Sequence, residues 1–290
     1  MPTLDDYRTE HPKIRPDFTI DQNWDAYTPA EHEVWRTLYA RQEKILPERA
    51  CGEFLDGLKK LEIGSSGIPD FRRLSDALHK LTGWIVVPVP GLVPDDVFFE
   101  HLANRRFPAG YFIRKPEQLD YIEEPDVFHD VLGHVPMLAH PTFADYMEAY
   151  GKGGLRAQGL GTLHHLARLY WYTVEFGLIR DKKGMKIYGS GIASSSAESI
   201  YSVESKSPNR IHFDLERVMR TKYRIDDFQE SYFVIDSFNE LFDATYQDFG
   251  PIYGRLNSGP TYEPGTVLAS DRVHTRGTHT YKGGSHAATA

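Results

Sequence analysis

Only one cysteine, Cys51, is present among the 290 residues of the chain. An internal disulfide is therefore excluded, and the fold is expected to stand without oxidative cross-links. A lone cysteine is more often a buried, inert residue than a nucleophile, so Cys51 is not assigned a role in catalysis. The scarcity of cysteine fits a reducing compartment and predicts a cytoplasmic protein.

Long apolar runs and basic blocks are also lacking. No stretch approaches the roughly 18 consecutive apolar residues of a membrane-spanning helix, and the N-terminus lacks the basic and apolar regions of a signal peptide. The formal net charge of −8 argues against a nucleic acid or a membrane surface as partner. The expected partner is therefore a small molecule.

Hydrophobic residues make up 40% of the chain and charged residues 26%, as in an ordinary globular protein with a large core. The apolar spacing mostly follows the helical period, so a mainly α fold with a few short strands is predicted. Short strands are expected at 84–89, 111–114 and 232–235. Helices are expected at 28–47, 51–62, 71–81 and 95–104, from Pro125 to near Pro136, from Pro141 to the glycine-rich stretch 151–154, and at 162–178, 193–204, 214–220 and 237–249.

One central domain, 28–256, is predicted, because no repeat or linker interrupts this range. Residues 1–27 are polar with scattered prolines and predict an irregular N-terminal arm. Residues 257–290 are rich in glycine, threonine, serine and histidine, and this composition predicts a loosely held C-terminal tail.

Two of the 13 histidines, His129 and His134, stand five residues apart. On a regular α-helix this spacing places two side chains about 140° apart, so they can share a metal only where the helix is interrupted. Gly133 and Pro136 predict such an interruption, with His134 at the frayed helix end. The spacing alone is a weak signal, because chance pairs are frequent among so many histidines.

Glu175 is the only acidic residue between Glu148 and Asp181, and its neighbours are aromatic or apolar. A carboxylate in such surroundings is costly to bury unless it is paired or bound to a cation. It is either a core residue paired with an arginine such as Arg168 or a metal ligand. Two imidazoles and one carboxylate are the ligand set of non-haem iron(II) oxygenases, which leave positions open for dioxygen and substrate.

The segments His-Asp-Val-Leu-Gly-His-Val-Pro at 129–136 and Val-Glu-Phe-Gly at 174–177 resemble the pterin-dependent aromatic amino-acid hydroxylases. The similarity is closest to the bacterial form, which consists of the catalytic core alone. It implies a single helical, basket-like catalytic domain without a regulatory domain or a tetramer-forming helix, and hence a monomer. Further segments match in order between about 17 and 256: Gly-Leu at 91–92, Tyr-Phe-Ile-Arg at 111–114, Tyr-Trp at 170–171, Tyr-Gly-Ser-Gly at 188–191 and Phe-Gln at 228–229.

The resemblance implies a ferrous ion bound by His129, His134 and Glu175, with dioxygen as co-substrate. It also implies a tetrahydropterin stacked on the ring of Phe98, which would otherwise be taken for a core aromatic residue. The other residues that the resemblance places at the pterin are Gly91, Leu92 and Val93 through their backbone, Glu198, and Asp130 through a pterin-bound water.

By the same resemblance, Arg114 binds the α-carboxylate of the amino-acid substrate. A guanidinium can do so with two parallel hydrogen bonds, whereas without the resemblance Arg114 would be a surface residue at the end of a strand. Trp171 and Ser194 complete the amino-acid pocket, and Pro125 packs near the substrate ring. Animal members carry threonine at the position of Ile122, so part of their carboxylate contact is expected to be missing here.

Tyrosine-selective members carry aspartate at the position of Ile225. An apolar residue there gives a phenolic hydroxyl no partner and discriminates against tyrosine. The resemblance therefore implies conversion of phenylalanine to tyrosine, although an aliphatic wall also accepts the indole of tryptophan. Two other classes stay open: a zinc hydrolase, whose signature needs histidines four apart with a glutamate between them, and a non-catalytic amino-acid-binding protein.

Overall fold

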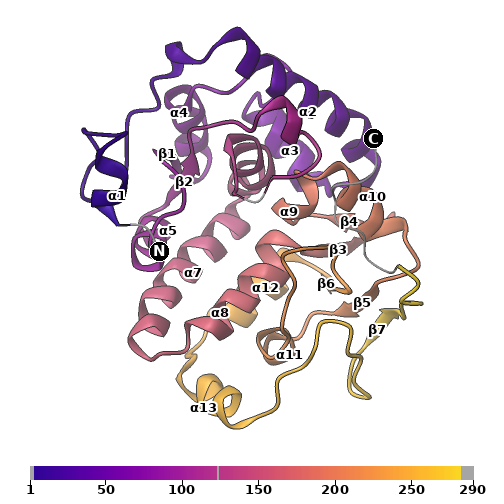
Figure 1. Cartoon of the computed structure of the whole chain (residues 1–290). Coiled ribbons are helices and arrows are strands. Elements are labelled where there is room, and N and C mark those ends of the chain that lie inside the picture. Colours follow the sequence, from indigo (N-terminus) through magenta and orange to yellow (C-terminus); the bar gives the residue numbers. More distant parts are fainter. Residues whose placement is uncertain (1–2, 123, 282–290) are drawn as a thin grey trace. The chain divides into compact units, whose positions relative to one another are not determined.

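The computed structural model describes residues 3–122 and 124–281. About half of the chain is helical, with a few short strands (Figure 1), so the predicted mainly α fold class is confirmed. Among the described residues, no helix is both long and apolar enough to cross a membrane. The chain divides into two compact units: the first holds the chain up to Lys44 together with Gly52–Arg156, and the second holds Ile45–Cys51 and the chain from Ala157 onward.

The first unit contains a two-stranded parallel sheet of β1 (Ile85–Val89) and β2 (Arg106–Gly110). Helix α4 (Phe71–Thr82) packs against β1, and α5 (Asp95–Ala103) packs against β2. The sheet and its helices form the frame behind the histidine pair described below. The other elements that begin in this unit are α1 (Leu4–Arg8), η1 (Trp24–Ala26), α2 (Pro29–Arg49), α3 (Gly52–Lys60), η2 (Pro116–Gln118), η3 (His129–His134), α6 (Val135–Leu138) and α7 (Pro141–Gly159).

The N-terminal arm is more ordered than its composition predicts. It contains the short helices α1 and η1, and the side chains of Phe18 and Ile20 are buried. The Ile20 amide donates a hydrogen bond to the Pro88 carbonyl oxygen at 2.9 Å. The arm is therefore tied to β1 and contributes to the core of the first unit.

The helix that begins at Pro141 does not end in the glycine-rich stretch, as predicted, but continues to Gly159 as α7. A Cβ at Gly151 would collide with the backbone of Ala103, and a Cβ at Gly154 would collide with the Phe99 ring. Both glycines thus permit a close approach between α7 and α5. Packing against α5 outweighs the low helix propensity of glycine here.

The second unit is built on a five-stranded sheet in the order β4-β3-β6-β5-β7. At its centre, β6 (Ser231–Ile235) is buried throughout and pairs in parallel with β3 (Leu178–Asp181) and β5 (Asn209–His212). At the two edges, β4 (Gly184–Ile187) and β7 (Val273–Thr275) pair antiparallel. The sequence predicts only β6, because the other strands are three or four residues long and show little alternation.

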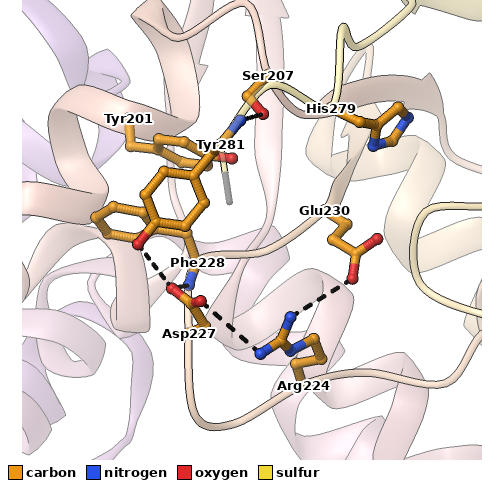
Figure 2. Close-up of a pocket in the computed structure, with 8 residues that line it drawn as sticks. All are labelled: Tyr201, Ser207, Arg224, Asp227, Phe228, Glu230, His279 and Tyr281. Carbon is orange, nitrogen blue, oxygen red and sulfur yellow. Dashed lines mark hydrogen bonds and ion pairs between the residues drawn. The ribbon is translucent and has the colours of Figure 1, made fainter. Parts of the chain in front are cut away.

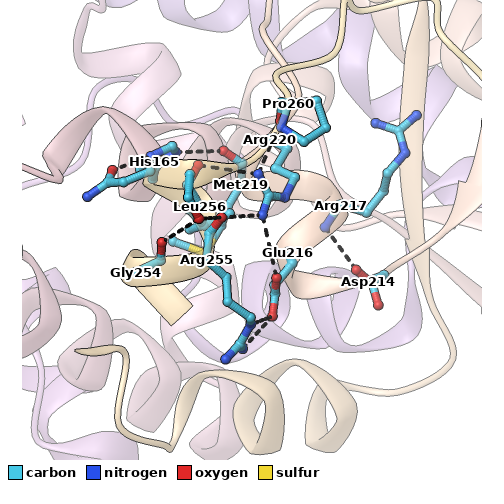
Figure 3. Close-up of polar contacts among 12 residues, drawn as sticks. His165, Asp214, Glu216, Arg217, Met219, Arg220, Gly254, Arg255, Leu256 and Pro260 are labelled. Atoms are coloured by element: carbon cyan, nitrogen blue, oxygen red, sulfur yellow. Dashed lines mark hydrogen bonds and ion pairs between the residues drawn. The ribbon is translucent and has the colours of Figure 1, made fainter. Parts of the chain in front are cut away.

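The helices of the second unit pack around this sheet and on one another. His165 Nδ1 lies 3.1 Å from the Met219 carbonyl oxygen and its Nε2 lies 3.2 Å from Asn257 Oδ1, so His165 is structural. Figure 3 shows these contacts beside Arg220, which donates to the Arg255 carbonyl oxygen at 2.6 Å. The helices are α8 (Leu163–Tyr170), η4 (Trp171–Glu175), α9 (Ser190–Ala193), α10 (Ser196–Glu204), α11 (Leu215–Met219), α12 (Phe238–Thr245) and α13 (Gly250–Ser258).

The segment 259–281 is firmly held, which differs from the loosely held tail that its composition predicts. Arg217 and Asp271 form a buried ion pair at 2.9 Å, with 6% and 4% of their side chains exposed. Arg217 Nη2 also donates to the Thr266 carbonyl oxygen at 2.6 Å, and β7 extends the sheet. These ion-pair and hydrogen-bond contacts do not depend on large apolar residues, so the composition of the segment does not predict them.

The last described residue, Tyr281, is also packed. Its ring lies 5.5 Å from that of Tyr201 and 5.2 Å from that of Phe228. Figure 2 shows the three rings together and the hydrogen bond that the Tyr281 hydroxyl donates to Asp227, at 2.9 Å. The part of the expected tail at 282–290 lies outside the described residues.

No strand forms at 111–114, where one is predicted. The Phe112 carbonyl oxygen accepts a hydrogen bond from the Val127 amide at 2.8 Å, and the Arg114 amide donates to the Asp126 carboxylate at 2.9 Å. Bonds to the segment that leads into η3 thus take the place of a strand ladder. They fix Arg114 next to the residues that precede His129.

Candidate functional site

His129 and His134 lie on one continuous helical segment, which does not break at Gly133 or Pro136 as predicted. His129–His134 form the π-helical turn η3, and α6 follows directly and includes Pro136. A π-helical turn closes hydrogen bonds between residues five apart, so such residues lie about one turn above each other. The wider turn, and not a break, therefore brings the two imidazoles together.

The two Nε2 atoms of the histidine pair are 3.3 Å apart, and the ring planes differ by 82°. His134 is 5% exposed and its ring centre lies 4.9 Å from that of Phe107 on β2, whereas His129 is half-buried. Metal–imidazole bonds of about 2.1 Å at near right angles put two nitrogens about 3 Å apart. The pair is therefore spaced to coordinate one ion.

Glu175 ends a second π-helical turn, η4, which the bond from the Phe176 amide to the Trp171 carbonyl oxygen closes at 2.8 Å. Glu175 is half-buried, and Ser190 Oγ donates to its Oε2 at 2.8 Å. A Cβ at Gly191 would lie only 3.2 Å from the same oxygen. The glycine thus lets α9 approach the carboxylate that Ser190 orients.

His129, His134 and Glu175 are a candidate set of metal ligands. Two imidazoles and one carboxylate fit a ferrous ion better than a structural zinc site, which takes four protein ligands. Arg168, the alternative partner considered for Glu175, donates to the Met219 carbonyl oxygen at 3.2 Å. The donor chemistry therefore fits the iron that the sequence predicts.

A second group of possible ligands, His212, Asp236 and Glu240, lies in the second unit. His212 Nε2 is 2.9 Å from Glu240 Oε1. Asp236, however, already pairs with Arg180 at 3.2 Å and with Arg272 at 3.1 Å. Two guanidinium groups neutralise this carboxylate and would repel a cation, so the group is an ion-pair network and not a second metal site.

Arg114 is buried, with 8% of its side chain exposed, and pairs with the fully buried Asp126. Its Nε and Nη2 donate to Asp126 Oδ2 and Oδ1 at 2.8 and 2.9 Å. Asp126 Oδ1 also accepts from the His129 amide at 3.0 Å. Burial alone would raise the pKa of Asp126, but the hydrogen bonds and charge of Arg114 outweigh it and lower the pKa. Asp126 thus has two roles: it orients Arg114, and it caps the helix that carries His129.

The expected pterin-binding segment precedes and enters α5. Phe98 is half-buried, in contrast to the buried Phe99 beside it. Leu92 is 52% exposed, and its carbonyl oxygen accepts a hydrogen bond from the Tyr7 hydroxyl at 2.9 Å. The backbone at 91–93 is thus anchored at the surface of the first unit.

Asp130 and Glu198, the two carboxylates expected near the pterin, differ in their surroundings. Asp130 is half-buried and its Oδ2 accepts from the Gly110 amide at 2.7 Å. Glu198 is buried in the second unit and accepts hydrogen bonds from the Tyr232 hydroxyl and the Gln229 amide. Burial raises the pKa of Glu198 to about 8, although both hydrogen bonds act in the opposite direction. A contact between Glu198 and the pterin stays a prediction.

The remaining predicted substrate residues lie in both units. In the second unit Trp171 is half-buried, and Ser194 Oγ donates to the Ser190 carbonyl oxygen at 2.8 Å. Ile225 is 71% exposed, and its place in the amino-acid pocket stays a prediction. In the first unit, half-buried Pro125 directly precedes Asp126.

A family model described as biopterin-dependent aromatic amino acid hydroxylase matches residues 13–251. The chain belongs to this family. The resemblance seen in the sequence is thereby confirmed, and with it the enzyme class, an iron monooxygenase that depends on a pterin. Membership also removes the zinc hydrolase from consideration.

Relatives of this hydroxylase match it over nearly their whole length. A phenylalanine-4-hydroxylase from Caulobacter vibrioides is 63% identical over 270 residues, which are 93% of this chain and 92% of that protein. One from Ralstonia nicotianae is 61% identical over 265 residues, or 91% and 85% of the two chains. An iron- and phenylalanine-bound crystal structure of phenylalanine hydroxylase from Chromobacterium violaceum is 55% identical, covers 94% of this chain and 100% of that chain, and matches with a TM-score of 0.86.

Two residues of this hydroxylase were missed in the sequence. Asp126 stands three residues before His129, the position of a carboxylate that caps a helix, and this was the available signal. Gln229 is buried and bonded to Trp171. The sequence places it only in the Phe-Gln segment that matches the family and does not predict its partner. Its role appears only once the distant residue is folded against it.

Proposed function

We propose that this hydroxylase converts L-phenylalanine to L-tyrosine with dioxygen and a tetrahydropterin at a non-haem ferrous ion. The observation that carries the proposal is the π-helical turn that sets the Nε2 atoms of His129 and His134 3.3 Å apart. Relatives at 61–63% identity that are phenylalanine-4-hydroxylases support the choice of substrate.

In this proposal His129, His134 and Glu175 hold the iron. The bound ion, together with the reduced pterin, supplies the oxygen-activating chemistry. Ser190 keeps the Glu175 carboxylate in a fixed orientation through its 2.8 Å hydrogen bond. The pterin stacks on the ring of Phe98, the backbone of 91–93 forms hydrogen bonds to the pterin edge, and Asp130 binds a pterin-bound water.

Arg114 receives the α-carboxylate of phenylalanine. Because its Nε–Nη2 edge is occupied by Asp126, the substrate is bound by the end that carries Nη1. The planar guanidinium can serve both carboxylates at once, which a lysine cannot do. Asp126 therefore prepares Arg114 before the substrate arrives, and this lowers the cost of ordering the side chain on binding.

The wall of the amino-acid pocket is proposed to consist of Pro125, Trp171, Ser194 and Ile225. Apolar Ile225 offers a phenolic hydroxyl no hydrogen-bond partner, so tyrosine is disfavoured as a substrate. An indole is larger than a phenyl ring but equally apolar on its face, so tryptophan is the competitor that the experiment must include.

The proposal is tested by coupled oxygen uptake and product analysis with ferrous ion, tetrahydropterin and phenylalanine, tryptophan or tyrosine in parallel. Tyrosine should form from phenylalanine at the highest kcat/KM. His129→Ala and Glu175→Ala should abolish turnover and lower the iron content of the purified protein. His79→Ala, an exposed histidine on α4, is the matched control and should behave as wild type.

Faster turnover of tryptophan would overturn the substrate assignment. Phenylalanine binding without any product, with iron bound, would instead support the non-catalytic alternative. Wild-type activity of Glu175→Ala would exclude this residue as a ligand.

A monomer in the cytoplasm completes the proposal. The single buried cysteine, Cys51, suits a reducing compartment. Light scattering during gel filtration should give a mass near the 33.1 kDa of one chain, and twice that mass would replace the monomer by a dimer.

A further inference from the structure

The Trp171 indole is held on several sides within the second unit. The Tyr223 ring stacks on it with centres 4.4 Å apart and planes 15° apart, and the Phe176 ring lies 4.8 Å away. Its Nε1 donates a hydrogen bond to Gln229 Oε1 at 2.9 Å. Stacked rings can slide or turn in their own plane. The hydrogen bond at the indole edge therefore fixes the in-plane position of the Trp171 ring, which stacking alone does not.

Gln229 is itself fixed, because its carboxamide has partners on both sides. The side chain is buried, and Nε2 donates to the carbonyl oxygens of Arg224 at 3.0 Å and Asp227 at 3.4 Å. Carbonyl oxygens only accept hydrogen bonds, and the Trp171 indole N–H only donates one. A single orientation of the amide therefore satisfies all three contacts.

The loop that carries Gln229 is anchored at several points. Arg224 reaches toward Asp227 at 3.8 Å and Glu230 at 3.7 Å, as Figure 2 shows. The backbone amide nitrogen of Gln229 lies 3.5 Å from the buried Glu198 carboxylate. The glutamine thus connects an anchored loop to the indole.

We propose that Gln229 is a positioning residue that sets the Trp171 indole in the amino-acid pocket. The role rests on the proposed function, because Trp171 forms the pocket wall only there. Ile225 lies on the same loop, four residues before Gln229. The glutamine therefore ties the loop that carries the proposed specificity residue to the aromatic wall, and it acts on the substrate through Trp171.

The first test is Gln229→Met, which keeps the length of the side chain and removes its donors and acceptor. KM for phenylalanine should rise about 5- to 10-fold, as the loss of one buried hydrogen bond gives. KM for the tetrahydropterin and the affinity for iron should not change. Gln247→Met, at an exposed glutamine, is the control and should leave all three values unchanged.

A second test asks whether the effect passes through the indole N–H. Trp171→Phe keeps an aromatic ring and removes the donor, so adding Gln229→Met to it should raise KM no further. The ultraviolet resonance Raman band that reports indole N–H hydrogen bonding, taken as a difference against Trp171→Phe, should shift in Gln229→Met. Should Gln229→Met not fold, Gln229→Glu takes its place: it keeps the acceptor for the indole N–H but not the donors, and it should raise KM less than about 5-fold.

Independent, multiplying effects of the two substitutions on KM would overturn the positioning role, as would an unshifted Raman band. Wild-type turnover is measured first. If the wild type does not hydroxylate phenylalanine, the proposed function fails; if it does and KM is unchanged in Gln229→Met, only the role of Gln229 fails.

Discussion

Arg114 and Asp126 form a buried two-point ion pair in which the carboxylate also caps the helix of His129. One residue of the pair is proposed to bind substrate, and the other supports a metal ligand. Substrate binding and metal binding in the first unit thus share one structural support. Its loss is expected to affect both stability and substrate affinity.

Asp126→Ala should therefore lower the free energy of unfolding by about 3–5 kcal/mol, because it leaves a buried guanidinium without its partner. KM for phenylalanine should rise in the same variant, since Arg114 loses its orientation. Urea denaturation and steady-state kinetics measure the two effects. Asp120→Ala breaks the exposed pair with Arg41 and should cost about 1 kcal/mol or less; an equal cost in both variants would contradict the prediction.

Ser190→Ala removes the hydroxyl that donates to Glu175 Oε2. Loss of such a supporting hydrogen bond to a ligand weakens metal affinity by about 10- to 100-fold in general. Titration of the metal-free protein with ferrous ion under anaerobic conditions should show this decrease. Ser258→Ala, at an exposed serine on α13, is the control, and an unchanged affinity in Ser190→Ala would show that Glu175 needs no such support.

Asp271→Ala should destabilise the second unit strongly, by about 3–5 kcal/mol, because the buried Arg217 loses its carboxylate. Glu263→Ala breaks the exposed pair with Lys222 in the same segment and should cost about 1 kcal/mol or less. Thermal unfolding followed by circular dichroism compares the two. Wild-type stability of Asp271→Ala would restore the view of a loosely held tail.

Glu198 should make stability depend on pH. Its pKa is about 8 in the folded chain, against a usual value of 4.5, so between these values the folded state keeps a proton that the unfolded state loses. The raised pKa contributes stability that is fully present below pH 4.5 and is lost as pH rises toward and through 8. The stability of wild type relative to Glu198→Gln, from urea titrations at pH 5 to 8, should therefore fall with pH; a constant difference would show an unperturbed carboxyl.

Much of the site was readable in the sequence because it depends on residue types at fixed spacings. His129, His134 and Glu175 stand in segments that resemble the family, and their donor set of two imidazoles and one carboxylate indicates iron. The means by which they converge was not readable. Gly133 and Pro136 predict a broken helix, whereas the structure has a wider, π-helical turn. Local helix propensity does not predict such a turn, because tertiary packing determines where it forms.

Polar contacts between residues far apart in the sequence could not be predicted either. Arg217 meets Asp271 and Trp171 meets Gln229 across more than 50 residues, and neither pair leaves a periodic trace in the sequence. Similarly, the glycines at 151–154 predict a helix end, because the sequence does not show that Gly151 and Gly154 permit the close contact with α5. Such features become visible only when both partners are in place.

The position of β7 has a consequence for synthesis on the ribosome. This outermost strand covers β5 but is made more than 60 residues later, so the backbone donors and acceptors on that side of β5 stay open while the chain grows. Open strand edges invite pairing with other chains. Prematurely terminated products that lack residues 273–275 should therefore aggregate, and the nascent chain is most in need of a chaperone until these residues have emerged.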